Sequence, residues 1–228
     1  MCVALIVPQN VRPSLETLRA CERANPHGGG IAWRKAGWVH WIKTNDVNEI
    51  YKLACKIKGE VVIHFRIASV GAVCDELRHP FPITRNARLN DRGKTRAVLF
   101  QNGTWPGYEA ALKLASEQGR DIPDGPMSDT RAAAFLASIN GHKFLSKCGH
   151  SRWVYFSATQ TITYGQWYKR DGIYYSNLHW QPLAPLKPHQ QSNQGIAAGE
   201  EVQELWDLSG VENYWEKICK YHRLNHES

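Results

Sequence analysis

The chain opens with the stretch Met1-Cys2-Val3-Ala4-Leu5-Ile6-Val7-Pro8. Residues 2–7 are apolar and rich in branched side chains, and Pro8 ends the run, so we expect a short buried strand. If Met1 is removed, Cys2 becomes the N-terminal residue. Its α-amine, with a reference pKa of about 7.7–8.0, can then take the proton of its own thiol. Taken alone, Cys2 fits a small buried residue better than it fits a nucleophile.

Further along the chain, apolar residues recur at both helical and strand spacings, with breaker residues between them. Helices are expected at residues 14–24, 46–59, 108–118 and 128–139, and strands at residues 31–33, 38–43, 61–65, 97–101, 153–157, 162–168 and 173–176. The last three strands alternate as in an antiparallel meander. Hairpins outnumber regular βαβ units, which predicts an α+β fold of layered antiparallel sheets.

The composition changes near residue 180. Residues 181–199 contain three prolines, four glutamines and two glycines, which is typical of a linker. Residues 200–221 have an amphipathic pattern with two tryptophans, for which packing on the chain's own core is the simpler interpretation and binding of a partner the alternative. We therefore expect one domain over residues 1–180, followed by a linker and a C-terminal helix over residues 181–228.

The bulk composition is that of an ordinary globular protein. Of the 228 residues, 43% are hydrophobic and 21% are charged, and the formal charge of +7 favours anionic partners. The six cysteines form no C-x-x-C pair, so we expect reduced thiols and a cytoplasmic location. The N-terminus has no basic leader, and no apolar run is long enough to cross a membrane. No pattern indicates a metal or an organic cofactor.

Two strand ends carry groups suited to holding a substrate. Arg66 follows the strand at 61–65, and its planar guanidinium can bind a carboxylate through two hydrogen bonds, although a surface ion pair explains it equally well. Asn102-Gly103 follows the strand at 97–101. There the Asn amide and the Gly backbone N–H can converge on an oxyanion, and an ordinary tight turn is the alternative.

Two later positions are open to a similar pair of interpretations. Asp129, in Ser128-Asp129-Thr130 at an expected helix start, either complements the helix dipole or receives a substrate ammonium. His79 stands in the rigid turn His79-Pro80-Phe81-Pro82. A packed histidine is the simpler interpretation there, and a contact with the substrate is the alternative. Each of these signals is weak by itself.

Together and in this order, the motifs resemble those of the class II glutamine amidotransferases, a branch of the N-terminal nucleophile hydrolases. The resemblance covers roughly residues 2–180. It rests on Met1-Cys2, Asn25-Pro26-His27-Gly28-Gly29-Gly30-Ile31-Ala32-Trp33, His64-Phe65-Arg66-Ile67-Ala68-Ser69, His79-Pro80-Phe81, Asn102-Gly103 and Ser128-Asp129-Thr130. The fold that the resemblance implies is a four-layer αββα sandwich of antiparallel sheets.

The resemblance also implies an activity, the hydrolysis of glutamine to glutamate and ammonia. Cys2 would attack the side-chain amide, while Asn102 and Gly103 would hold the oxyanion. Arg66 would pair with the α-carboxylate of glutamine, and Asp129 would pair with its α-ammonium. Four further substrate-binding residues are implied, namely Gly29, Gly30, Ser69 and His79.

Three positions depart from the family's pattern. His27 stands where the family often has an acidic residue, and Ser69-Val70-Gly71 stands where it often has Thr-His-Gly. Gln101 replaces the histidine that usually precedes Asn-Gly. These departures bear on substrate detail rather than on the nucleophile.

The destination of the ammonia is the open question. Known relatives deliver it to a synthetase domain that is commonly fused, so here we expect either a separate ammonia-accepting partner or a stand-alone hydrolase of another γ-glutamyl or acyl amide. A non-catalytic binding protein on the same scaffold is the third interpretation.

The segment 85–96 carries five basic residues. We expect a solvated hairpin near the mouth of the pocket, with docking of an anionic partner as the alternative. No recognisable nucleic-acid fold supports binding of nucleic acid.

Overall fold

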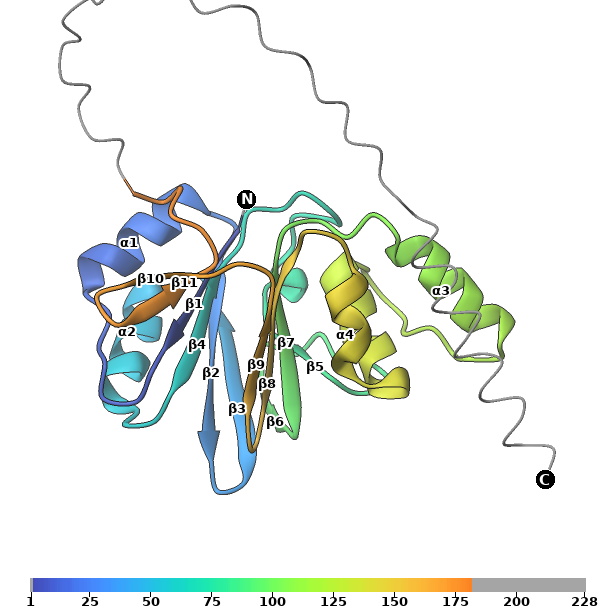
Figure 1. The fold of residues 1–228 in the computed structure, drawn as a ribbon, viewed down its shortest axis with the longest axis horizontal. Helices are drawn as coiled ribbons and strands as arrows, with labels where there is room; N and C mark the ends of the chain where they lie inside the picture. Colours follow the sequence, from blue (N-terminus) through green and yellow to red (C-terminus); the bar gives the residue numbers. More distant parts are fainter. Residues whose placement is uncertain (1, 182–228) are drawn as a thin grey trace, which may run out of the picture. The chain divides into compact units, whose positions relative to one another are not determined.

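The α+β architecture expected from the sequence is confirmed. The computed structural model describes residues 2–181, and its helices and strands are shown in Figure 1. The helices are α1 (Leu15–Ala24), α2 (Val47–Lys56), α3 (Tyr108–Glu117) and α4 (Asp129–Asn140), with short 3₁₀ turns η1 (Asp75–Leu77) and η2 (His142–Lys147). The strands are β1 (Val3–Val7), β2 (Gly29–Lys35), β3 (Trp38–Thr44), β4 (Val61–Phe65), β5 (Phe81–Pro82), β6 (Arg92–Thr95), β7 (Ala97–Asn102), β8 (Arg152–Ser157), β9 (Thr161–Tyr164), β10 (Tyr168–Arg170) and β11 (Ile173–Tyr175).

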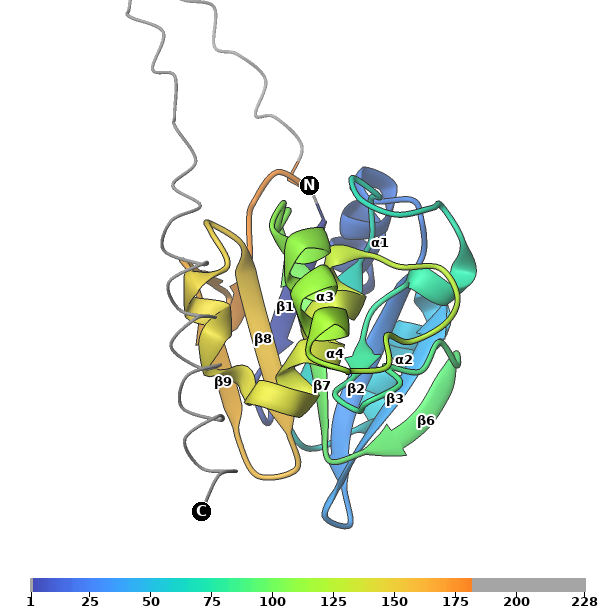
Figure 2. The ribbon, with the colours of Figure 1, turned by 90° about the vertical axis from the view of Figure 1, so that its right-hand side faces the viewer.

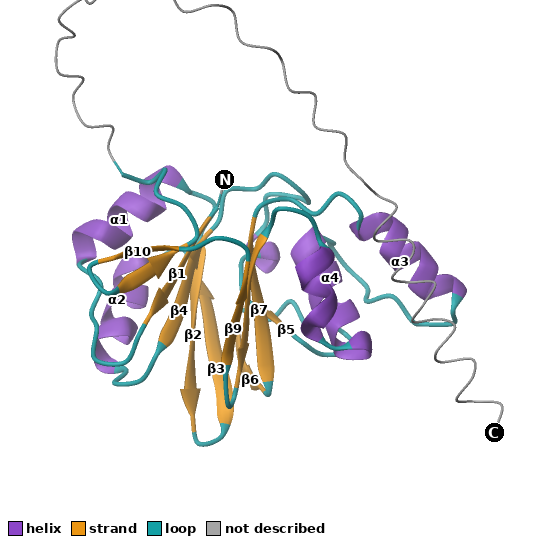
Figure 3. Ribbon diagram, in the orientation of Figure 1, coloured by secondary structure: helices purple, strands orange, loops and turns teal. Residues whose placement is uncertain are grey.

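The strands form two antiparallel sheets that pack face to face. The large sheet has the order β10-β11-β1-β4-β2-β3-β6, and the small sheet has the order β5-β7-β8-β9. Helices α1 and α2 cover the outer face of the large sheet, and α4 lies on the outer face of the small sheet with α3 beside it (Figures 1 and 3). The view in Figure 2, turned by 90°, shows α3 and α4 in front of the strands. The layers are therefore those of an αββα sandwich.

Strand alternation builds the two halves of the core. In β4, Ile63 belongs to the apolar cluster shared with α1 and α2, whereas its neighbour Val62 belongs to the cluster between the sheets. In β2, Ile31 and Ala32 divide in the same way. Because successive side chains of a strand point to opposite faces, a run of continuous apolar residues is what a strand buried on both faces requires.

The helix starts follow the sequence signals. Ser14 and Ser128 are N-caps, and their hydroxyls accept hydrogen bonds from the backbone N–H groups of Thr17 and Arg131. These caps satisfy donors that the first turn leaves unpaired. The cap at Ser128 bears on the site, because it fixes the start of α4 and with it the position of Asp129.

The expected meander at residues 153–176 is partly wrong. β8 and β9 do pair in the small sheet, but the strand expected at 162–168 is divided, and β10 and β11 pair in the large sheet. Gly165 lies in the break with a φ of +81°. The chain thus crosses from one sheet to the other between β9 and β10, and this crossing brings β11 beside β1.

The basic segment 85–96 also differs from the expectation of a hairpin. Its last part is β6, which pairs with β3 at the edge of the large sheet. Met1, the expected C-terminal helix and all of the expected linker except Gln181 lie outside the described residues. Within residues 2–181, none of the helices has the length and apolar character needed to cross a membrane.

Candidate active site

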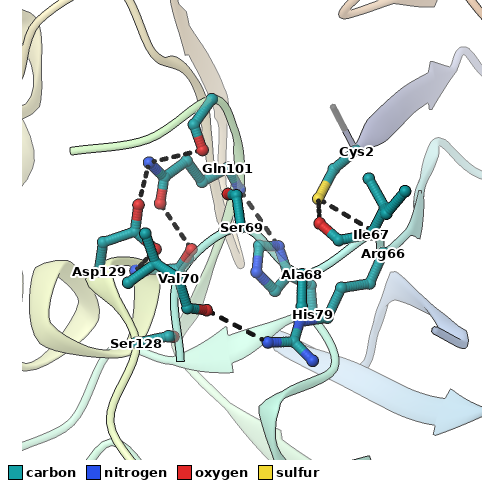
Figure 4. Close-up of a pocket in the computed structure, with 12 residues that line it drawn as sticks. Cys2, Arg66, Ile67, Ala68, Ser69, Val70, His79, Gln101, Ser128 and Asp129 are labelled. Atoms are coloured by element: carbon teal, nitrogen blue, oxygen red, sulfur yellow. Dashed lines mark hydrogen bonds between the residues drawn. The ribbon is translucent and has the colours of Figure 1, made fainter. Parts of the chain in front are cut away.

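Cys2 and Arg66 lie at the adjacent ends of two neighbouring strands. β1 and β4 are antiparallel, with Val3 opposite Phe65, so the residue before β1 meets the residue after β4. The Cys2 thiol donates a hydrogen bond to the Ile67 carbonyl at 3.2 Å, and the Ile67 N–H points back to the sulfur at 3.4 Å (Figure 4). Burial raises the pKa of the Cys2 thiol. The sulfur is therefore protonated at neutral pH and needs a base to become a nucleophile.

The guanidinium of Arg66 is buried and only partly paired. One terminal nitrogen, Nη2, donates to the carbonyls of Ala72 at 3.0 Å and Val70 at 3.4 Å. The other, Nη1, is buried without a hydrogen-bond partner among the residues that the structure describes. A buried charged donor without a partner is costly. Its position in the pocket therefore suits an anionic ligand group such as a carboxylate.

The Asn102-Gly103 pair ends β7 in the small sheet. Asn102 is fully buried, and its side-chain amide donates to the Ser176 hydroxyl at 2.9 Å. Gly103 has a φ of +128°, and a Cβ at this position would lie 2.8 Å from the Ser151 hydroxyl oxygen. Both the backbone conformation and the close approach of Ser151 therefore require glycine.

Asp129, the first residue of α4, is held by three donors. Its carboxylate accepts from the backbone N–H groups of Thr130 and Trp105, both at 2.9 Å, and from the Gln101 side-chain amide at 3.0 Å. Burial raises the pKa of the Asp129 carboxyl, and these hydrogen bonds oppose that shift. A carboxylate has about four acceptor positions, so one remains for a further cationic donor.

Gln101 is a residue whose role sequence reasoning missed. Its amide nitrogen donates to both Asp129 and the Ser151 hydroxyl at 3.1 Å, while its amide oxygen accepts from the Thr130 hydroxyl at 2.6 Å. One side chain therefore joins Asp129 to Ser151, which packs against Gly103. The only sequence signal was that Gln101 stands where the resembled family usually has histidine.

Two stacked histidines hold the main chain of Gln101. The His64 ring donates from Nε2 to the Gln101 carbonyl at 3.0 Å, and the His79 Nδ1 accepts from the Gln101 N–H at 3.4 Å. The ring centroids are 3.9 Å apart. Burial lowers the pKa of His64 to about 3 and that of His79 well below its usual value, so both rings are neutral. His79 is thus largely a packed histidine, although it also borders the pocket.

One small pocket brings most of the candidate residues together. Its volume is about 20 Å³, which is space for water rather than for an amino acid. Figure 4 shows Cys2 and Asp129 at opposite sides of it. Six of the residues expected from the sequence line the pocket: Cys2, Arg66, Ser69, His79, Gly103 and Asp129. The Ser69 hydroxyl is 3.2 Å from that of Thr104, so it links the two loops beside the pocket.

Three expected residues do not line this pocket in the part of the chain that is described: Asn102, Gly29 and Gly30. The two glycines lie in β2, opposite Phe65 and His64. A Cβ on Gly30 would lie 2.1 Å from the His79 carbonyl oxygen, and one on Gly29 would lie 2.7 Å from the His64 carbonyl oxygen. The structure therefore gives these glycines a packing reason, the close approach of other backbone segments.

None of the five basic residues of the segment 85–96 lines this pocket. Among residues 2–181, no group of three or more His, Cys, Asp or Glu side chains is arranged to hold a metal ion. The five cysteines in this range are free thiols.

No protein-family model and no curated protein matches the sequence. Solved structures do match its fold. The glutamine phosphoribosylpyrophosphate (PRPP) amidotransferase from B. subtilis, complexed with ADP and GMP, is 16% identical with a TM-score of 0.50 over 77% of this chain. The allosteric regulatory enzyme of purine biosynthesis is 18% identical with a TM-score of 0.50, again over 77% of this chain.

The present chain spans 41% of the length of each of these two proteins. At this level of identity the match establishes architecture rather than activity. The four layers and the antiparallel sheets agree with the sandwich that the resemblance implies. The αββα fold of the described residues is therefore similar to the folds of these two solved structures.

Proposed function

We propose that this chain hydrolyses the side-chain amide of glutamine, with Cys2 as an N-terminal nucleophile. The observation that carries the proposal is the convergence of four groups from distant parts of the sequence. Cys2, Arg66, Gly103 and Asp129 border the same pocket. A thiol, a cation for a carboxylate, a backbone turn for an oxyanion and an anion for an ammonium are the set that a glutamine substrate requires.

Each group has one role in the proposed reaction. After Met1 is removed, the α-amine of Cys2 takes the thiol proton, and the sulfur attacks the amide carbon. The Gly103 N–H and the Asn102 amide stabilise the oxyanion, since an amide nitrogen has two hydrogens and Ser176 engages only one of them. The α-amine then protonates the leaving nitrogen, and ammonia departs. Water attacks the thioester and releases glutamate.

The binding end of the site sets the length of the substrate. Arg66 would bind the α-carboxylate through its unpaired Nη1, and Asp129 would bind the α-ammonium through its remaining acceptor position. Ser69 and His79 would border the bound amino acid, whereas Gly29 and Gly30 would act through packing behind it.

A glutaminase assay on the full chain tests this proposal. Intact mass first establishes that Met1 has been removed, and glutamate release is then measured with glutamine and, as a control, with asparagine, whose side chain is one methylene shorter. We expect turnover of glutamine, loss of turnover in Cys2→Ala, and no change in Cys55→Ala. Absence of glutamate from Met-free protein near neutral pH would overturn glutamine as the substrate.

The ammonia acceptor is part of the proposal as well. We propose that ammonia passes to an acceptor on a separate protein, which would raise glutamine turnover when added. Turnover of a γ-glutamyl anilide in place of glutamine would instead indicate the stand-alone hydrolase. Retention of Met1 in protein from its natural host would rule out the α-amine mechanism and favour a binding protein.

A further inference from the structure

We propose that Ser176 and Asn177, which directly follow β11, are positioning residues that hold the nucleophile and the oxyanion-binding amide in one fixed arrangement. The inference rests on the proposed function, because it concerns the geometry of the same site. Neither residue belongs to a motif in the sequence, and neither lines the pocket among the described residues. Their effect on the reaction would be exerted through Cys2 and Asn102.

The Ser176 hydroxyl joins the two sheets at the site. Its oxygen accepts a hydrogen bond from the Ala4 N–H at 2.8 Å and another from the Asn102 side-chain amide at 2.9 Å. Ser176 also donates its own N–H to the Ala4 carbonyl at 2.9 Å. The side chain is fully buried. A single oxygen thus connects the backbone two residues after Cys2 with the side chain proposed to hold the oxyanion.

Asn177 fixes the nucleophilic residue itself. Its amide nitrogen donates to the Cys2 carbonyl at 2.6 Å, and its amide oxygen accepts from the His179 N–H at 3.0 Å. The Cys2 thiol is held independently by the backbone of Ile67. Cys2 is therefore held through its side chain by one segment and through its main chain by another, which restricts the direction in which the sulfur points.

These contacts lie beyond the end of the strand ladder. The pairing of β1 with β11 reaches Leu5, opposite Tyr175. Towards the N-terminus, β1 stays paired with β4 on its other edge. On the β11 side, the contacts described above for Ser176 and Asn177 continue the pairing to Cys2. Loss of either side chain would loosen this end of β1 while leaving the sheet intact.

The Asn102 amide depends on Ser176 for its orientation. The side-chain oxygen of Asn102, Oδ1, has no hydrogen-bond partner within residues 2–181, so the bond to Ser176 is what sets the rotation of the amide plane. With one N–H committed to Ser176, the second N–H has a defined direction. Small displacements of reacting groups, on the order of 1 Å, can lower a rate about 100-fold.

The test compares Ser176→Ala with Ser157→Ala. Ser157 is a matched control, because it too is a buried serine at a strand end whose hydroxyl bonds to backbone, in the turn to Gln160. We expect Ser176→Ala to lower kcat for glutamine about 10- to 100-fold with KM within about threefold of wild type, whereas Ser157→Ala leaves both unchanged. Ser176→Thr, which keeps the hydroxyl, should recover most of the lost kcat.

A second readout does not need turnover. The rate of iodoacetamide alkylation is followed at Cys2 by peptide mass spectrometry over pH 6 to 10, with Cys55 as the internal reference. We expect the pH profile of Cys2 to shift in Asn177→Leu, which removes the donor to the Cys2 carbonyl without adding a charge, and to stay unchanged in Ser157→Ala. The unfolding midpoints of all variants show whether a loss of kcat or of Cys2 reactivity results from a loss of folded protein.

The outcomes separate the two proposals. If wild-type protein does not turn over glutamine but Asn177→Leu still shifts the Cys2 profile, the positioning role stands and glutamine as substrate fails. If both kcat in Ser176→Ala and the Cys2 profile in Asn177→Leu equal those of wild type in folded protein, the positioning role is overturned. An equal loss of kcat in Ser157→Ala would also overturn it.

Discussion

The two sheets contribute to the candidate site in different ways. The large sheet supplies Cys2 and Arg66 at the ends of adjacent strands, where the main-chain ladder brings them together. The small sheet supplies Gly103 and, through α4, Asp129, and there a side chain, that of Gln101, makes the connection. A change of side chain leaves the β1–β4 ladder in place, whereas the link between Asp129 and Ser151 is lost with the Gln101 side chain. Substitutions on the two sides should therefore differ in kind.

The largest expected effect comes from removing the Cys2 thiol, which the large sheet presents. Cys2→Ala should lower glutamine turnover by at least about 10⁴-fold, because no other group can form the thioester. The fold should be unaffected, since the β1–β4 ladder does not use the thiol. Glutamate release and circular dichroism check both parts. Turnover within tenfold of wild type would show that the nucleophile lies elsewhere.

The next effect is on stability and tests the backbone packing behind the large sheet. Gly30→Ala should reduce the free energy of unfolding by about 3 kcal/mol, because the new Cβ would lie 2.1 Å from the His79 carbonyl oxygen. Gly59→Ala is the matched control, since nothing lies within 4 Å of a Cβ at that position. Urea unfolding of both variants gives the comparison. Equal stabilities would contradict the close approach of β2 to the His79 turn.

A smaller effect is expected where the small sheet relies on a side chain. Gln101→Leu removes the bonds to Asp129, Ser151 and Thr130, and should cost about 2 kcal/mol of stability because buried polar groups lose their partner. It should also raise KM for glutamine about tenfold, since Asp129 loses its support. Gln101→His, which restores a hydrogen-bond donor, should recover part of the lost stability and part of the wild-type KM. Unchanged KM in Gln101→Leu would show that Asp129 is fixed without Gln101.

The last effect concerns pH and needs no change to the active-site residues. His64 is neutral in the folded state with its pKa lowered to about 3, against about 6.5 in the unfolded chain. Below pH 6.5 the unfolded state binds more protons, so stability should fall as pH decreases, by about 1.4 kcal/mol per pH unit for each such histidine. The lowered pKa of His79 adds in the same direction.

A double variant isolates this contribution. His64→Gln keeps a donor for the Gln101 carbonyl, and His79→Asn keeps an acceptor for its N–H, but neither replacement titrates in this range. The slope of unfolding free energy between pH 7 and 5 should be flatter in the double variant than in wild type. Identical slopes would mean that other groups carry the acid sensitivity.

The sequence predicted the apolar strands more reliably than the polar ones. The apolar run at residues 61–65 predicted a strand, and the structure has β4 there with every residue buried. β6 was missed because Arg92-Gly93-Lys94-Thr95 is polar and lies at a sheet edge, where charged residues are common. The break at Gly165 was overlooked because aromatic residues, which favour strands, stand on both sides of it at Tyr164, Trp167 and Tyr168.

The residues of the candidate site likewise divide into those that the sequence nominated and those that it did not. The order of the motifs was enough to nominate Cys2, Arg66, Gly103 and Asp129, since each stands at a recognisable strand end or helix start. It was not enough to nominate Gln101 or Ser176, because their hydrogen bonds join residues far apart in the chain, 74 positions in the case of Ser176 and Asn102. Such bonds are set by tertiary packing and leave no local pattern in the sequence.

The place of β1 between β4 and β11 has a consequence for synthesis on the ribosome. Val3 pairs with Phe65, so one edge of the first strand can be covered early, but Leu5 pairs with Tyr175 and its other edge stays bare until most of the chain has emerged. A bare strand edge invites pairing with other nascent chains. Translation that stops before β11 should therefore yield aggregating fragments rather than a weakened hydrolase.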